Sequence, residues 1–333
     1  MDTARSASIK KMNENKMFDF KTGIMKKVFS VLVFGCGLLI TASAQDSLQT
    51  KEELQKVVKK IKFVKNTFRS TRIINIQSVE MGAKNYMQFM ISHHFGNIWN
   101  EGGGAENFAQ LLGLNSGVAH TYLAIDYSPL NQLNLGVAAT GNAAFEGWAK
   151  IKIFKQQTGK KNIPLSVVWY SVFNVDASNR APDADVAWNR FSFMHQILIA
   201  RKFNTKFSLQ LSPTMVHYNV IPYGIHNSNN IFSMGIEGRY ALTDKKSLTF
   251  EYSRQFNMYE HVIDKTGNIN TYEPNLLALG IEFFTGGHVF QFYIGNTTDA
   301  TNISQLSRNT NKFKLGQFAL GFHLNRSFFI GKE

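Results

Sequence analysis

Cysteine is almost absent from this sequence, which has 1 among 333 residues. That residue, Cys36, lies in an apolar stretch near the N-terminus that we expect to be removed during export. The mature chain would then contain no cysteine. Disulfide bonds, cysteine metal sites and thiol nucleophiles are therefore excluded for it.

Long apolar runs are also scarce, and the clearest one spans residues 28–40. Two lysines precede it, and the small residues Ala42, Ser43 and Ala44 follow it. This order is typical of a secretory signal peptide, so we predict a signal peptide at 25–44 with cleavage after Ala44. Residues 1–24 are then an upstream extension, because Met25 is the better start.

Acidic residues are fewer than basic ones, 23 against 36, and the net charge is +13. Much of the positive charge outside the predicted signal peptide lies in residues 51–72. A basic protein can contact nucleic acid. Export instead makes anionic lipid, lipopolysaccharide or polysaccharide the expected partners, and we expect no nucleic acid.

Helical periodicity is confined to residues 47–65. Thr50 and Glu53 form a capping box, and apolar residues recur at helical spacing opposite a lysine-rich face. We therefore predict a basic periplasmic helical segment at 45–67. Two interpretations stay open, a solvated helix or a helix that lies on a membrane surface or plugs a barrel lumen.

Phenylalanine is abundant, with 28 residues, and most of the remaining chain alternates between apolar and polar residues. The mean hydropathy of −0.17 fits a soluble protein. A transmembrane β-barrel has the same average, because only alternate residues face lipid. Twelve runs read as strands near bilayer-spanning length: 79–95, 121–127, 133–140, 145–153, 165–175, 191–202, 207–218, 232–240, 248–252, 277–283, 290–295 and 318–328.

The connections between these runs separate a barrel from a soluble sandwich. Short links alternate with longer polar links, apart from the short link at 141–143. This alternation around an even number of strands predicts an all-β, transmembrane, antiparallel up-and-down barrel of about twelve strands over 68–333, with both ends on the periplasmic side. Pro213 falls inside a run, so we expect a β-bulge there.

Several motifs resemble an uncharacterised family of outer-membrane β-barrel proteins from Bacteroidetes-type bacteria. They include F-x-S-T-R-x-I-N, which starts at Phe68, and T-G-G-H-V-F-Q at residues 285–291. The resemblance covers about 68–328 and implies a barrel fold and an outer-membrane location. It implies no activity, because the family is a domain of unknown function. The chain departs from many such barrels in that Phe328 and Phe329 are near its end but not terminal.

The polar face of the predicted strands carries charged residues that should point into the lumen. A salt-bridged network that fills the barrel and a charged constriction that selects solutes are the two interpretations. The predicted lumen charges are Asp126, Glu146, Lys150, Lys152, Lys202, Glu237, Arg239, Glu251 and Glu282.

Histidines are the other candidates for chemistry. His93 and His94 are adjacent in a strand, so they point to opposite faces and cannot bind one metal from the same side. One of them could meet His195 or His323 in the lumen, but no metal-binding or haem motif supports such a site. His288 follows two glycines in a predicted hairpin turn, where a turn or interface role is expected. We predict no metal and no cofactor.

We expect a narrow channel or solute-binding barrel with a charged lumen. The alternative is a blocked structural or surface-interaction barrel whose long extracellular loops bind a partner. An outer-membrane enzyme is the third possibility, but we recognise no catalytic constellation and predict no enzyme. Expected partners are the lipid bilayer, lipopolysaccharide, the barrel-assembly machinery during biogenesis, and a small solute.

Overall fold

A computed structural model describes residues 60–98, 106–111, 120–141, 143–178, 186–220, 228–256, 259–263, 269–272, 275–309 and 311–331. The chain divides into two compact units, 1–57 and 58–333. All described residues belong to the second unit. The predicted signal peptide, its cleavage site and most of the predicted periplasmic helix lie outside them.

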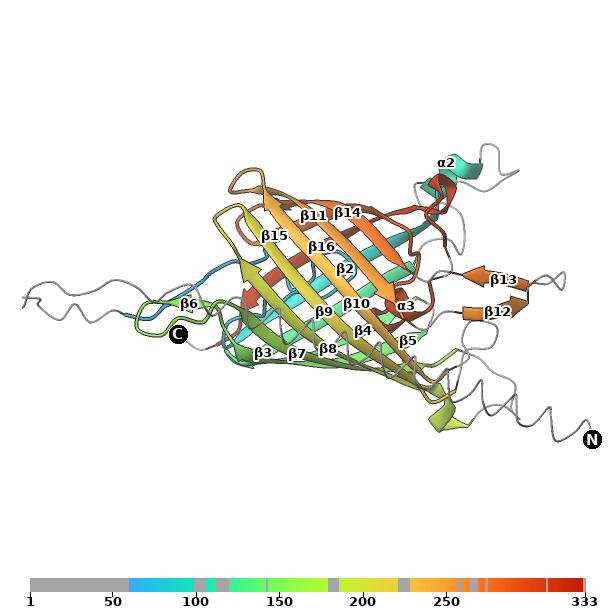
Figure 1. The fold of residues 1–333 in the computed structure, drawn as a ribbon, viewed down its shortest axis with the longest axis horizontal. Coiled ribbons are helices and arrows are strands. Elements are labelled where there is room, and N and C mark those ends of the chain that lie inside the picture. Colours follow the sequence, from blue (N-terminus) through green and yellow to red (C-terminus); the bar gives the residue numbers. More distant parts are fainter. Residues whose placement is uncertain are drawn as a thin grey trace, which may run out of the picture. The chain divides into compact units, whose positions relative to one another are not determined.

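Twelve antiparallel strands close into a barrel, as predicted (Figure 1). Their order around the wall is β10-β11-β14-β15-β16-β2-β3-β4-β5-β7-β8-β9, and β9 pairs with β10 to complete the circle. The wall strands are β2 (Tyr86–Asn97), β3 (His120–Leu130), β4 (Leu133–Thr140), β5 (Ala144–Phe154), β7 (Ser166–Asp176), β8 (Phe191–Lys202), β9 (Phe207–Tyr218), β10 (Asn230–Ala241), β11 (Lys246–Gln255), β14 (Leu276–Phe284), β15 (His288–Gly295) and β16 (Ala319–Phe329).

The remaining elements are not part of the barrel wall. They are β1 (Lys62–Phe63), which pairs with β6 (Gln157–Thr158), the hairpin β12 (Tyr259–Ile263) and β13 (Ile269–Tyr272), and the short helices α2 (Glu106–Leu111), η2 (Ala187–Arg190), α3 (Asn302–Ser307) and η3 (Leu315–Gln317). No helix in the described part of the chain is long and apolar enough to cross a bilayer.

Short turns and long loops alternate around the barrel as the sequence predicts. Turns such as 131–132, 203–206 and 285–287 lie at one end, which we call the short-turn end. The long-loop end carries the connections after β2, β7, β9, β11 and β15, together with the short link 141–143. The start of β2 and the end of β16 meet at the short-turn end, where the backbone N–H of Ile330 donates to the carbonyl of Asn85 at 2.9 Å.

The two faces of the wall have the reverse polarity of a soluble protein. Inward positions are polar and buried, for example Ser92, Gln196 and Ser212. Outward positions are apolar and exposed, for example Val137 at 61% and Leu279 at 56% exposure. Burying the polar face and exposing the apolar one is stable only if lipid covers the outside, because apolar surface is costly in water.

Three local predictions were wrong. Residues 62–63 form β1 instead of continuing the predicted helix, and the run that starts at Val79 becomes a strand only from Tyr86. The expected bulge at Pro213 is absent, because the register between β8 and β9 is the same before and after it. The ladder instead lacks two residue pairs there, which fits the missing N–H of proline.

Candidate functional site

A hairpin that precedes the first wall strand fills the lumen. It spans residues 67–80, which we call the plug. Its two arms are held by a hydrogen bond from the N–H of Ser78 to the carbonyl of Thr71 and a bridge between Arg72 and Gln77. The N–H of Ile73 donates to the carbonyl of Ile76 and closes the tip. The plug enters from the short-turn end, because the chain returns there to begin β2.

Wall side chains hold the plug mainly through its backbone. The Glu251 carboxylate accepts the N–H groups of Ile74 at 2.6 Å, Asn75 at 2.8 Å and Ile76 at 2.9 Å. Gln291, from β15, donates to the carbonyl of Ile73 at 2.7 Å. Buried backbone groups are costly unless they are paired, so the wall supplies the partners that a short hairpin cannot supply itself.

Two further wall residues extend this contact. The Nζ of Lys150 donates to the carbonyls of Thr71 and Ser78 at 2.9 and 3.1 Å. Gln210 donates to the carbonyl of Gln77 at 2.8 Å and accepts the N–H of Val79 at 3.0 Å. Lys150, Gln210, Glu251 and Gln291 come from β5, β9, β11 and β15, so the plug is held from several sides.

Glycines in the wall leave room for the apolar tip of the plug. A Cβ on Gly280 would lie 3.2 Å from the Cδ1 of Ile74, and a Cβ on Gly235 would lie 3.3 Å from the Cδ1 of Ile76. Both isoleucines are 1% exposed. The absence of side chains at these two wall positions therefore matches the shape of the plug.

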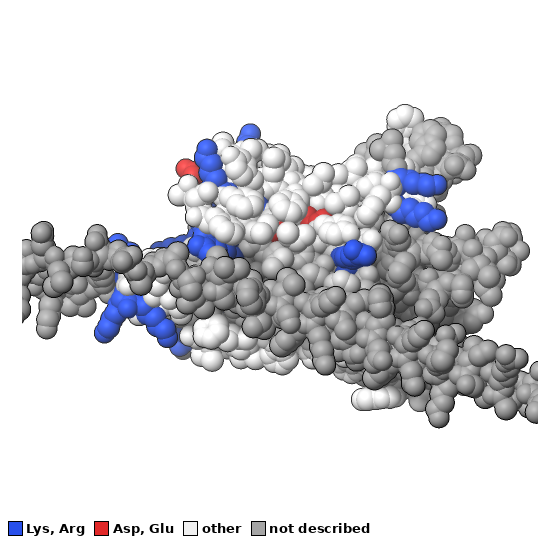
Figure 2. Space-filling view, in the orientation of Figure 1, with Lys and Arg blue, Asp and Glu red and all other residues white. Residues whose placement is uncertain are grey.

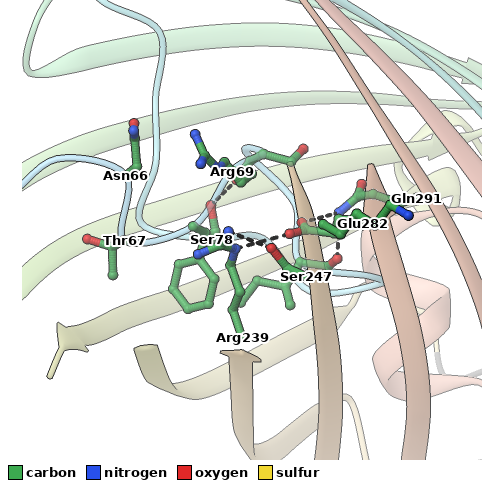
Figure 3. A network of polar contacts seen from close by, with 12 residues as sticks. Asn66, Thr67, Arg69, Ser78, Arg239, Ser247, Glu282 and Gln291 are labelled. Carbon is green, nitrogen blue, oxygen red and sulfur yellow. Dashed lines mark hydrogen bonds and ion pairs between the residues drawn. The ribbon is translucent and has the colours of Figure 1, made fainter. Parts of the chain in front are cut away.

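An ion pair lies beside the plug on the inner wall (Figure 3). The Nε of Arg239 is 3.2 Å from the Glu282 carboxylate, and its terminal nitrogen donates to Ser247 at 2.5 Å. Gln291 donates to the same carboxylate at 3.0 Å, so it joins the ion pair to the plug backbone. Both charged partners are at least 97% buried and paired, as burial of charge requires.

Helix α3 closes the lumen from the long-loop end. The Asn302 amide accepts from Arg72 of the plug at 2.8 Å and donates to Glu146 of the wall at 2.6 Å and to Tyr122 at 3.0 Å. Ser307, at the other end of the helix, contacts the hydroxyl of Tyr218 at 2.6 Å. Asn302 therefore connects the plug, the wall and the β15–β16 loop.

All nine predicted lumen charges lie at inward positions of the wall, but they do different things. Seven are buried: Asp126, Glu146, Lys150, Glu237, Arg239, Glu251 and Glu282. Lys152 and Lys202 are half-buried at the short-turn rim, where Lys202 donates to the carbonyl of Lys65 at 2.9 Å. Glu251 and Lys150 bind the backbone of the plug, and Lys202 binds the backbone of the segment just before it. Three of the nine predicted lumen charges therefore bind the chain that precedes β2.

The histidines divide between the two faces. His94 and His323 point inward with ring centroids 5.6 Å apart, whereas His93 and His195 point outward, His195 against Trp169. His288 stacks on Phe290 beside its turn. Among the described residues no group of three or more His, Cys, Asp or Glu could hold a metal ion. Ser92 contacts His323 at 2.5 Å, but both are fully buried and closed to a substrate.

A cavity of about 570 Å³ lies at the long-loop end, between the inner wall and the β15–β16 loop. We call it the vestibule. Most of its lining is polar, with hydroxyl and amide side chains, two acids and two arginines. Its lining includes Asn174, Asp176, Arg190, Tyr218, Asp299 and Arg308. The vestibule ends at α3, so the closed lumen forms its floor.

In the vestibule, the negative charge of Asp299 is opposed by the positive charge of Arg308. Burial raises the pKa of the Asp299 carboxyl above its ordinary value, and the guanidinium of Arg308 acts in the opposite direction. Arg190 donates to the backbone carbonyls of Asp176 and Ser178, both at 2.8 Å, and so anchors the wall of the cavity. A cavity of this kind suits a small polar solute better than an apolar one.

The sequence pattern predicts neither the plug nor α3. The motif at 68–75 resembles a family feature, but its residues do not indicate a position inside the barrel. One local signal existed, because 68–80 lacks the long, regular alternation of the wall strands. The glycines at 235 and 280 mark the receiving wall only once the pairing of strands is known.

Comparison with known proteins supports the fold. The family model described as "Membrane bound beta barrel domain (DUF5777)" matches residues 68–328. A search of the curated proteins found no match.

Several solved structures are similar to this chain. The NanC porin is 7% identical, covering 73% of this chain and 98% of that one, with a TM-score of 0.44. The KdgM porin is 8% identical, covering 74% and 99%, with a TM-score of 0.41. Salmonella typhi OmpF, in a complex with daunomycin, is 5% identical, covering 73% and 97%, with a TM-score of 0.35. Similarity at this level says nothing about a solute or a role.

The matched segment begins with the plug and ends in the last wall strand, so the family includes both parts of the structure described above. The apolar outer face and the closed ring of strands agree with that description. The chain belongs to this family of membrane-bound β-barrel domains.

Proposed function

We propose that this protein is an outer-membrane channel for a small polar solute that rests in a closed state, with residues 67–80 as its plug. The observation that carries the proposal is the way in which the wall holds the plug. Glu251, Lys150, Gln210 and Gln291 bind it through hydrogen bonds that water could replace if the plug moved. The plug has no covalent link to the wall except the chain that leads into β2.

The vestibule is the proposed entrance. It lies at the long-loop end, is lined mostly by polar side chains, and ends at α3, which is bonded to the plug. A solute captured there would reach the lumen when α3 and the plug shift. The predicted signal peptide and the lipid-facing outer band support an outer-membrane location for this arrangement.

The test is a lock on the plug. The Gln88 amide donates to the Thr71 hydroxyl at 3.1 Å, so cysteines at these two positions lie close enough for a short thiol-to-thiol linker. Planar-bilayer recordings of T71C/Q88C should show openings before cross-linking and none after it. Each single cysteine variant treated with the same linker should keep its openings.

A second candidate is a permanently closed barrel whose loops bind a partner at the cell surface. The buried contacts of Asn302 favour it, because they bind α3 both to the plug and to the wall. The same recordings separate the two. If both the unlinked variant and a plug-weakened E251Q variant are silent, the channel proposal fails and the closed barrel is retained.

A further inference from the structure

The short-turn end of the barrel is strongly basic. Exposed lysines occupy its turns, including Lys160 and Lys161 after β5, Lys206 between β8 and β9, and Lys245 between β10 and β11. Of the acidic residues that the structure describes at this end, Glu282 is buried against Arg239, and the two that are not buried are Glu80, which accepts from the plug backbone, and Asp244. Figure 2 shows Lys and Arg gathered at the ends of the visible surface, with a mostly uncharged band between them.

Three cations at this end point outward from the wall and lie over aromatic rings. Arg201 is 5.1 Å from the ring centroid of Phe203, and Arg326 is 4.8 Å from that of Phe328. Lys246 is 5.8 Å from that of Phe283. Each cation neighbours a buried inward residue in its strand, so its own side chain faces the lipid.

These three pairs are spread along one arc of the barrel. Arg201 lies on β8, Lys246 on β11 and Arg326 on β16, with two strands between β8 and β11 and two between β11 and β16, whereas the arc from β2 to β7 carries none of the three. Aromatic rings at a barrel end lie at the level of the lipid headgroups. A cation held over such a ring is at the depth of the headgroup phosphates, with its remaining donors directed to the interface.

We propose that Arg201, Lys246 and Arg326 form a belt that binds anionic phospholipid headgroups in the leaflet at the short-turn end. Charge complementarity supports this occupant, because basic residues near a membrane attract anionic lipid. At the long-loop ends of the described wall strands, the outward-facing cation is Arg254. The plug enters at the short-turn end, so the belt faces the periplasmic leaflet, where phospholipid is the available anion.

Native mass spectrometry of the whole mature protein tests the belt. The protein is released from nanodiscs that contain phosphatidylglycerol and phosphatidylcholine in equal amounts. Wild type should retain several-fold more phosphatidylglycerol than phosphatidylcholine. R201Q/K246Q/R326Q should lose this preference, whereas R201K/R326K, which keeps the charges, should retain it. A gel shift on heating verifies that each variant is folded.

A control variant and two competing anions complete the test. R254Q, which removes a cation at the opposite end of the barrel, should leave the preference for phosphatidylglycerol unchanged. Equal retention of both lipids by wild type overturns the proposal, as does an unchanged preference in the triple glutamine variant. Displacement of the lipid by inorganic phosphate would assign a free-anion site, and a stronger preference for lipopolysaccharide that depends on the same three residues would place the belt in the other leaflet. Either outcome overturns it.

Discussion

Glu251, on β11, accepts three consecutive backbone N–H groups that begin at Ile74, a residue 177 positions earlier in the chain. One carboxylate therefore satisfies the three backbone N–H donors at the tip of the plug. The tip has no other described partner for these three donors. Replacement of Glu251 should therefore weaken the binding of the plug more than it weakens the pairing of the wall strands.

We expect E251Q to loosen the plug. Hydrogen bonds to a charged acceptor contribute more than those to a neutral one, so the opening free energy should fall by about 2 kcal/mol, or about 30-fold in the open population. Hydrogen exchange at residues 74–76 measures this directly. Q196A is the matched control, because Gln196 is a buried wall residue that contacts Thr214. Equal exchange in both variants would contradict the assigned role of Glu251.

Asn302 should be needed for closure from the long-loop end. N302A leaves Arg72 and Glu146 without their shared partner, at a cost of about 2–4 kcal/mol. We expect protease cleavage within the β15–β16 loop to become faster while the wall remains folded. N311A, which removes a contact with Asn97 near the rim, should change cleavage little.

Gly280 should be intolerant of even a methyl group. Its Cβ would lie 2.7 Å from the Thr249 hydroxyl and 3.2 Å from Ile74, so overpacking in G280A should cost about 1–3 kcal/mol of stability. I74V removes the contacting Cδ1, so G280A/I74V should lose less stability than the sum of the two single variants. Thermal unfolding in detergent provides the double-mutant cycle. Strict additivity would mean that Ile74 does not occupy this space.

The β15–β16 loop should be more stable in mild acid than at neutral pH. Burial raises the pKa of Asp299, so the folded state binds its proton more tightly than the unfolded state does. This stabilisation is complete below the unfolded pKa and is lost as the pH rises through the folded one. Hydrogen exchange of α3 should therefore increase with pH more than the intrinsic rate does. D299N should remove that excess, and an identical profile in D299N would rule out Asp299 as its source.

How much the sequence predicts depends on the range of the interaction. Strand alternation reports a local choice between lipid and lumen, so the inward direction of Glu237 and Glu251 follows from their neighbours. Their partners do not follow, because Glu237 contacts Ser212 only when β9 and β10 have paired in register, and Glu251 accepts the N–H of Asn75 only when the plug, far earlier in the chain, lies inside the barrel. For the same reason the twelve strands were predicted while the plug was missed. Its buried isoleucines are packed against glycines about 160 to 200 residues later in the chain.

The way in which the plug is held has a consequence for folding. Its partners come from β5, β9, β11 and β15, so they are assembled around it only when the ends of the sheet have met at β2 and β16. Contacts of such long sequence separation form late, because their loop-closure entropy must be overcome first. Binding of the plug inside the barrel therefore indicates that the barrel has closed. A fluorophore placed on it would distinguish a closed barrel from an open sheet during insertion.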